Sequence, residues 1–319
     1  MWGIFVMARK RTEASGGARW PEYLLVALRV LAPPERLTVT QWADKYRVLD
    51  SMSAAMPGRW TTSITPYLSG IMDEFNNPYT TEIIFVKCTQ IGGTEAMLNM
   101  LLSIIHTSPT PTVLMFPSER LARSTSLLRI QPALRATPEL RERWREDLSD
   151  MLMLLCTGMP LTLIGGHSVP ASSSAAYQNV FVDEVDKFPA AQKREADTVT
   201  LLRERSKTFL GQKFVEASTP TTTSGRIWRD MMAADEIRHY FVPCPHCNEF
   251  IELQFQHLKF PKAESGLSYV ERAELASYVC QNCGAVIEER DKQSMLRRGE
   301  WRPIKQRTAR PKSVAFWMG

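Results

Sequence analysis

Short apolar runs alternate with helix-forming segments between residues 83 and 218, and this alternation restricts the chain to few folds. The expected strands are 83–87, 112–116, 161–166, 179–184 and 213–218, and the expected helices among them are 94–107, 118–134 and 190–209. Buried strands that alternate with helices indicate a mostly parallel sheet with both faces covered. We therefore predict an α/β fold in which ligands bind beyond the carboxyl ends of the strands.

The segment KCTQIGGTE (87–95), which follows the first strand, has the layout of a phosphate-binding loop in an altered order. In the pattern G-x-x-x-x-G-K-[ST] the lysine directly precedes Ser/Thr. Here Lys87 stands where the first glycine belongs, and Gly93 stands where the lysine belongs. Gly92 and Gly93 offer an unhindered backbone to an anion, and Thr94 offers a hydroxyl to Mg²⁺. A structural turn is the alternative for this segment alone.

The strand 179–184 ends in two adjacent carboxylates, as a Walker B segment does. Asp183 would hold Mg²⁺ together with Thr94, and Glu184 would polarise the attacking water. Lys87 has a long and flexible stem, so its ammonium can reach the phosphates from the first position of the loop. Either acid alone would fit the beginning of a solvated loop. The two segments together predict a site for ATP and Mg²⁺.

Four of the six cysteines form two Cys-x-x-Cys pairs, Cys244–Cys247 and Cys280–Cys283, separated by 32 residues. This pattern predicts a tetrahedral Zn²⁺ site of the ribbon kind, with a disulfide pair or a chance arrangement as the alternatives. The long gap leads us to expect an extended hairpin between the pairs. His246 and His257 lie nearby, but four thiolates already complete the zinc shell.

Several segments follow, in order, the pattern of the lambda-type phage terminase large subunits, the GpA-like family: PGRWTTSITPYLSGIMDEF, KCTQIGGTE, FVDEVDKFP, RSKTF and EASTPTTTSGRI. The resemblance extends over roughly residues 36–319. It implies an ASCE-type P-loop ATPase with a three-layer sandwich and a Cys₄ zinc-ribbon insertion. Its hydrolysis of ATP would drive double-stranded DNA into the procapsid. The implied partners are DNA, the small terminase subunit, the portal protein and further copies of the chain in a ring, in the host cytoplasm.

The resemblance also implies roles for single residues in the hydrolysis of ATP. Some family members carry the phosphate-binding lysine at the beginning of the loop, which makes Lys87 the working lysine and Gln90 a loop contact. Gly93 replaces a lysine that is common in relatives. Arg205 matches an arginine of the family and becomes the candidate for stabilising transition-state charge.

Two further pairs of residues match the family outside the phosphate loop. Ser218 and Thr219 match a segment thought to couple hydrolysis to motion. Trp60 and Tyr67 match the family's GRW…PY pattern and would frame the adenine, although a packing role fits them equally well.

The expected organisation has four parts: a leader and helix at 1–35, the P-loop ATPase domain at 36–235, the zinc-ribbon module at 236–290, and a basic segment at 291–319 leading towards an absent C-terminal nuclease domain. Further helices are expected at 21–31, 41–50 and 66–75. From Arg290 to Lys312 the chain has nine Lys/Arg and two acidic residues, which permits a polyanionic partner. No apolar run approaches the ~18 residues that a membrane span needs, so no membrane partner is expected.

Two other functions remain open from the sequence. One is a helicase-like DNA translocase that takes no part in packaging. The other is a zinc-ribbon DNA-binding protein whose ATP site has decayed, for which Gly93 is the best support.

The altered order of the loop generates a prediction. Lys87→Ala is expected to abolish ATP hydrolysis, because no other lysine of the loop can reach the phosphates, whereas Gly93→Lys is expected to be tolerated or activating. The measurement is phosphate release by the purified variants. Turnover at the wild-type rate by Lys87→Ala would show that this lysine does not serve the site.

Overall fold

The computed structural model describes residues 35–51, 56–166, 175–188, 197–262 and 265–319. The predicted leader and the predicted helix at 21–31 lie outside these residues, as does the beginning of the helix predicted at 190–209. In the described part of the chain, no helix combines the length and apolar character that a membrane crossing requires.

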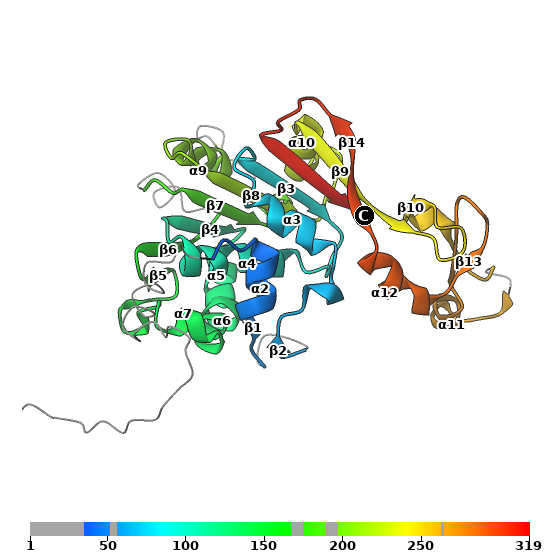
Figure 1. Ribbon diagram of the computed structural model, residues 1–319, viewed down its shortest axis with the longest axis horizontal. Coiled ribbons are helices and arrows are strands. Elements are labelled where there is room, and N and C mark those ends of the chain that lie inside the picture. Colours follow the sequence, from blue (N-terminus) through cyan, green and yellow to red (C-terminus); the bar gives the residue numbers. More distant parts are fainter. Residues whose placement is uncertain (1–34, 52–55, 167–174, 189–196, 263–264) are drawn as a thin grey trace, which may run out of the picture. The chain divides into compact units, whose positions relative to one another are not determined.

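A ten-stranded sheet forms the centre of the fold (Figure 1). Its strand order is β10-β9-β15-β3-β8-β7-β4-β6-β5, with β14 paired to β9. Neighbours from β9 to β6 are parallel, and β5, β10 and β14 pair in the antiparallel sense. The strands are β3 (Glu82–Lys87), β4 (Thr112–Phe116), β5 (Met153–Cys156), β6 (Met159–Gly165), β7 (Asn179–Asp183), β8 (Lys213–Ser218), β9 (Glu236–Pro243), β10 (Phe250–Glu252), β14 (Glu300–Gln306) and β15 (Ser313–Met318). The prediction of a mostly parallel α/β sheet is confirmed.

Helices cover both faces of this sheet, because alternate side chains of each central strand point to opposite sides. Ile83 and Phe85 of β3 belong to one buried cluster, with side chains of α2, α3 and α4. Ile84 and Val86 belong to the other cluster, with side chains of α9 and α10. The helices are α2 (Val39–Tyr46), α3 (Leu68–Glu74), α4 (Gly93–Thr107), α5 (Glu119–Thr125), the π-helix η2 (Ser126–Ile130), α6 (Gln131–Ala136), α7 (Pro138–Arg141), α9 (Thr198–Ser206), α10 (Arg226–Ala233), α11 (Tyr269–Glu274) and α12 (Glu289–Arg297).

The region before β3 differs from the sequence prediction at one helix end. Thr38 caps α2 through a capping box with Gln41. The sequence offers both Thr38 and Thr40 as caps for this helix, and the structure uses Thr38. The helix ends at Tyr46, whereas the prediction extended to residue 50. Instead, β1 (Val48–Leu49) pairs with β2 (Gly58–Arg59). The helix predicted from Pro66 is α3.

The central sheet runs across the predicted boundaries after residues 235 and 290. β9 and β10 belong to it, and so do β14 and β15 from the segment predicted to leave the ATPase domain. β15 lies between β9 and β3, and its Phe316 is fully buried in the core. A strand inserted next to β3 is part of the central sheet and not an extension from it.

Residues 244–287, which we call the cysteine segment, contain a short form of the hairpin expected between the two cysteine pairs, in which Leu258 pairs with Tyr278 and Lys259 with Ser277 in the antiparallel sense. β10 pairs with β9 in the large sheet. A separate three-stranded sheet contains β11 (Leu258–Lys259), β12 (Ser277–Val279) and β13 (Val286–Ile287). The helix α11 lies between β11 and β12 in sequence, because Ser268 and Glu271 form a capping box that starts a helix there.

Candidate active site

The carboxyl ends of β3 and β7 bring together a lysine and a pair of acids. Lys87 is the last residue of β3, and Asp183 is the last residue of β7, with β8 between the two strands. The Lys87 Nζ donates to Glu184 Oε1 at 2.9 Å. Glu184 has a left-handed backbone (φ 56°), which turns the chain sharply at the end of the strand. Segments 97 residues apart in sequence thus meet in one ion pair.

Gly93 makes room for the stem of Lys87. A β-carbon built on Gly93 would lie 2.5 Å from Lys87 Cδ and 2.7 Å from Lys87 Cε. A side chain at position 93 therefore requires the flexible stem of Lys87 to shift. The tolerance of Gly93→Lys stays a prediction, in which the second lysine would have to share this space with Lys87. In the present chain, the stem of Lys87 occupies the space that the glycine leaves.

Asp183 and Thr94 provide oxygen atoms of the kind that Mg²⁺ prefers. The Thr94 hydroxyl donates to Asp183 Oδ2 at 2.7 Å. Asp183 Oδ1 is buried and has no hydrogen-bond partner among the described residues. Burial raises the pKa of Asp183, while the Thr94 hydroxyl and the charge of Lys87 oppose that shift. A buried carboxylate oxygen without a donor, next to a hydroxyl, fits a hard divalent cation.

Glu184 is held in its charged form by two lysines. Burial acts to raise its pKa, but the hydrogen bond and charge of Lys87, followed by those of Lys187, lower the pKa below the ordinary value. Lys187 Nζ lies 3.1 Å from Glu184 Oε2. Sequence reasoning missed Lys187, although its place three residues after the catalytic candidate on a short turn was visible.

The loop between β3 and α4 has the backbone that an anion site needs. Gln90 and Gly92 are left-handed, with φ values of 62° and 84°. α4 begins at Gly93 and continues for 15 residues, so its N-terminal amide groups face the loop. The first turn of a helix attracts negative charge.

A cavity of about 530 Å³ lies beside this loop. The loop contributes Gln90, Ile91 and Gly92 to its lining, and Trp60 lines it from the opposite segment. Tyr67 does not line the cavity; its ring packs edge-on against Tyr240, with 6.1 Å between the ring centroids. The sequence left two roles open for both aromatics. The structure places Trp60 at the cavity and Tyr67 in the packed core.

Ser218 connects the end of β8 with the turn that follows Glu184. Its Oγ accepts from the Asp186 N–H at 3.2 Å. Asp186 in turn accepts from the Ile227 N–H at 2.8 Å and from the Thr221 N–H at 3.3 Å. Thr219 Oγ1 is buried and has no hydrogen-bond partner among the described residues. Sequence reasoning missed Asp186, which ties the acidic turn to the start of α10.

Arg205 is not brought to this site within the chain. It is exposed near the end of α9. Arg203, on the same helix, has its Nε 3.7 Å from Oε1 of Glu82, the first residue of β3, whereas Lys87 is the last. Five residues of strand separate those positions by about 16 Å. Arg205 therefore lies near the amino ends of the strands, whereas the site lies at their carboxyl ends.

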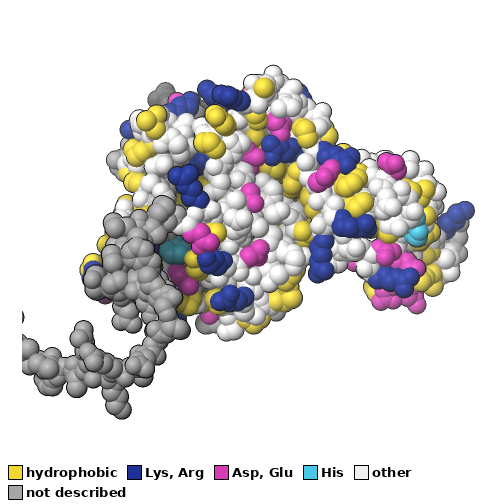
Figure 2. All heavy atoms as spheres, viewed as in Figure 1, with side chains coloured by type: hydrophobic (Ala, Val, Ile, Leu, Met, Phe, Trp, Pro, Cys, Tyr) yellow, Lys and Arg dark blue, Asp and Glu magenta, His cyan; other side chains and the backbone are white. Residues whose placement is uncertain are grey.

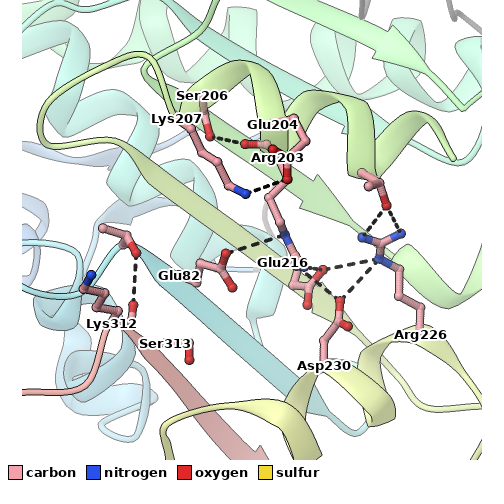
Figure 3. A network of polar contacts seen from close by, with 12 residues as sticks. Glu82, Arg203, Glu204, Ser206, Lys207, Glu216, Arg226, Asp230, Lys312 and Ser313 are labelled. Atoms are coloured by element: carbon pink, nitrogen blue, oxygen red, sulfur yellow. Dashed lines mark hydrogen bonds and ion pairs between the residues drawn. The ribbon is translucent and has the colours of Figure 1, made fainter. Parts of the chain in front are cut away.

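Arg203 belongs instead to a buried ionic network behind β8 (Figure 3). Glu216 at its centre is fully buried, with Arg203 NH2 at 3.5 Å and Arg226 Nε at 3.9 Å. Asp230 on α10 also contacts both arginines. Burial, followed by the charge of Asp230, raises the pKa of Glu216 well above its ordinary value. The network joins β8, α9 and α10.

The four cysteines of the two pairs converge on one point. Their Sγ atoms all lie within 4.8 Å of one another. The two turns repeat the same bonds: Cys244 N–H donates to Glu249 O at 2.9 Å, and Cys280 N–H donates to Ala285 O at 2.9 Å. Each turn then has a left-handed residue, Asn248 or Gly284.

The surroundings of the sulfurs shift the pKa values of two of the thiols in opposite directions. Backbone N–H donation from Glu249, followed by other hydrogen bonds, lowers the pKa of Cys247 to about 7, whereas burial raises that of Cys244 to about 11. His246 Nε2 lies 2.9 Å from Val286 O, so its ring contacts backbone. Four convergent sulfurs on two matching turns fit a tetrahedral Zn²⁺.

Comparison with known proteins supports an ATPase. The sequence profile of the family described as "Phage terminase large subunit gpA, ATPase domain" matches residues 54–301. The chain is similar to the terminase large subunit of Enterobacteria phage P21, with 26% identity over 294 residues, 88% of this chain and 44% of that protein. It is 24% identical to the terminase large subunit of Escherichia phage lambda over 283 residues, 86% of this chain and 43% of that protein. The chain thus spans less than half the length of these relatives.

Among solved structures, the chain resembles the large terminase of bacteriophage HK97, with a TM-score of 0.48 and 12% identity over 61% of this chain and 40% of that chain. It also resembles the large terminase ATPase domain of Thermus phage P74-26, with a TM-score of 0.40 and 12% identity over 54% of this chain and 69% of that chain.

The contact between Gly93 and Lys87 predicts a loss of function from the smallest possible side chain. Gly93→Ala is expected to weaken ATP binding by about 10- to 100-fold, the effect of losing one charge-assisted hydrogen bond from Lys87. The measurement is the Kd for ATP by calorimetry. In the Lys87→Ala background the same change is expected to add little, because the displaced group is already gone. Equal losses in both backgrounds would show that Gly93 acts independently of the lysine.

Proposed function

The chain belongs to the family of the phage terminase large subunit gpA ATPase domain, and from this membership we propose that it hydrolyses ATP to drive double-stranded DNA into a procapsid. The observation that carries the proposal is the meeting of Lys87, Thr94, Asp183 and Glu184 at one edge of the sheet. These are the groups that phosphoryl transfer requires, a cation, a hydroxyl and two carboxylates.

We propose that the phosphates of ATP lie at the start of α4, where they compete with Glu184 for the ammonium of Lys87. Gln90, Gly92 and Gly93 would supply backbone contacts to the same oxygens. Thr94 and Asp183 would hold Mg²⁺, which neutralises charge on the phosphate oxygens when bound. The cavity beside Trp60 would take the adenine, in direct continuation of the loop.

Glu184 would orient and deprotonate the attacking water. Its lowered pKa keeps it a carboxylate at neutral pH, and the ammonium of Lys87 occupies one of its oxygens in the absence of phosphate. Once the phosphates attract Lys87, that oxygen becomes available to water. Lys187 would remain on the other oxygen and hold the carboxylate in place.

The coupling of hydrolysis to motion would begin at Asp186. A displacement of the turn after Glu184 moves Asp186, which is bonded to Ser218, Thr221 and Ile227. Ser218 thereby would link the phosphate site with α10, and Thr219, which matches the family's coupling segment, follows it in the chain. Arg205 would contribute to a site only in another copy of the chain, because it lies near the amino ends of the strands of its own sheet. A homo-oligomeric ring, as implied by the family, provides such a neighbour.

We propose that Zn²⁺ is held by Cys244, Cys247, Cys280 and Cys283. A closed shell of four thiolates stabilises the fold of the cysteine segment, which has only a small sheet of its own. We further propose that residues 37–243 and 300–318 act as one ATPase unit from which this segment projects.

The DNA contact would be to the phosphate backbone, as a translocase that reads no sequence requires. The basic stretch 290–312 is only partly free for this role. Arg302 stacks on Phe250 at 4.1 Å, and Arg307 donates to the carbonyls of Met232 and Ala233. On the face shown in Figure 2, Lys and Arg side chains are scattered among acidic and apolar ones. The small terminase subunit and the portal protein are the further proposed partners, in the host cytoplasm.

A decayed ATP site is the weaker proposal. Gly93 was its best support, yet the stem of Lys87 needs the space that Gly93 leaves. The residues of the loop and of the acidic pair retain their mutual contacts.

The test of the proposed function is phosphate release from ATP by the purified chain, with and without long double-stranded DNA. We expect turnover that rises with DNA. Glu184→Gln should lower kcat by about 10²- to 10⁴-fold, the contribution of a general base, while ATP still binds. A folded, zinc-loaded chain without turnover in either condition would contradict the proposal.

The metal proposal predicts one zinc per chain by elemental analysis. Cys283→Ser should reduce the zinc content and lower the unfolding temperature, because a shell of three thiolates binds zinc more weakly. Cys88→Ser is the control, since Cys88 lies outside the cluster. Equal zinc in both variants would show that the metal is bound elsewhere.

A further inference from the structure

One wall of the cavity beside the phosphate loop is held from a distant helix. Residues 61, 64 and 65 line this wall. Gln293 on α12 donates its Nε2 to Ser63 O at 2.9 Å and to Ile64 O at 3.2 Å. Arg297, one turn later on the same face, donates its Nε to Ser63 O at 3.3 Å. Some 230 residues of chain separate the donors from their acceptors.

The wall has little internal structure to hold its shape. Its only regular element among the described residues is a single 3₁₀ turn, η1 (Thr62–Ile64). Asp44 Oδ1 accepts from the Thr62 N–H at 2.7 Å on one side. On the other side, the exposed carbonyls of Ser63 and Ile64 accept from side chains of α12.

α12 itself is firmly anchored in the core. Met295 and Leu296 are buried, and the Tyr240 hydroxyl on β9 donates to Leu296 O at 2.7 Å. β9 ends at Pro243, directly before Cys244, and α12 begins two residues after β13, which ends at Ile287. Met295 and Leu296 also belong to one buried cluster with Ile251 and Ile287, so the helix packs against the cysteine segment.

We infer that Gln293 and Arg297 are positioning residues for the nucleotide base. They hold the wall of residues 61–65 at the distance from Gln90 and Ile91 that a base requires. Base affinity thereby depends on the orientation of the cysteine segment. This inference rests on the proposed nucleotide site and adds a connection to it that the phosphate contacts do not have.

The connection reaches the base and not the phosphates. Lys87, Thr94 and Asp183 come from β3, α4 and β7, and no hydrogen bond or ion pair between described residues joins their side chains to α12. Loss of the bonds from α12 should therefore weaken ligands that carry a base and spare those that do not.

The double variant Gln293→Ala/Arg297→Ala tests the inference with two probes, ATP and inorganic tripolyphosphate. We expect the Kd for ATP to rise by about three- to tenfold, the effect of one or two exposed hydrogen bonds, and the Kd for tripolyphosphate to stay unchanged. KM for ATP should rise with little change in kcat.

Three control variants accompany the double variant in the same two binding measurements. Arg290→Ala/Lys292→Ala removes charges from the same helix whose ion pairs are with Glu288 and Glu289, and it should leave both affinities unchanged. Gln293→Ala/Arg297→Lys keeps one donor and should restore part of the ATP affinity. Lys87→Ala should weaken both probes.

Each other outcome overturns the inference in a recognisable way. Unchanged ATP affinity in the double variant would show that α12 does not position the wall. Equal losses for ATP and tripolyphosphate would show a general loss of fold. A wild-type chain that binds neither probe would overturn the proposed function, and this inference with it. If the wild type binds both probes and the double variant binds ATP equally well, only the inference about α12 is overturned.

Discussion

The stem of Lys87 passes over the α-carbon of Gly93, and the geometry of the candidate site depends on that contact. It allows an ammonium that starts at the end of β3 to reach Glu184 beyond the intervening β8. A side chain at 93 would occupy the same space. In this unusual order of lysine and glycine, the missing side chain at position 93 leaves the space that the stem of Lys87 occupies.

Beyond this contact, hydrogen bonds and ion pairs of buried polar side chains join β8, α9 and α10 to one another and to the turn after Glu184. Asp186 links the turn after Glu184 to the start of α10. Glu216 and its arginines link α10 to α9 and β8. Buried charges of this kind are costly unless they are paired, so each tends to preserve the arrangement of its partners. α12 does the same for the wall near Trp60, through hydrogen bonds instead of charges.

Much of the fold could be predicted because local patterns specify it. The strands at 83–87, 112–116 and 213–218 occur where apolar β-forming residues predicted them. A threonine cap was expected before the helix at 41–50, at Thr38 or Thr40, and Gln41 three residues after Thr38 completes the capping box there. β5 escaped prediction: buried Leu154 and Cys156 alternate with more exposed Met153 and Leu155, but all four side chains are apolar, so the sequence shows no alternation. The hairpin expected in the cysteine segment is present but short, and a capping box starts a helix between its two strands.

For the site, the chain's own residues specified which chemical groups are present: a lysine and glycines after one strand, two acids after another, and two pairs of cysteines. Side-chain type and spacing carry that information locally. Only the folded chain decided that Gly93 shelters Lys87, that Arg205 lies near the amino ends of the strands, that β15 inserts beside β3, and that α12 holds the wall of the cavity. These relations join residues up to about 230 positions apart, and a local pattern cannot encode which distant surface will come to lie against it.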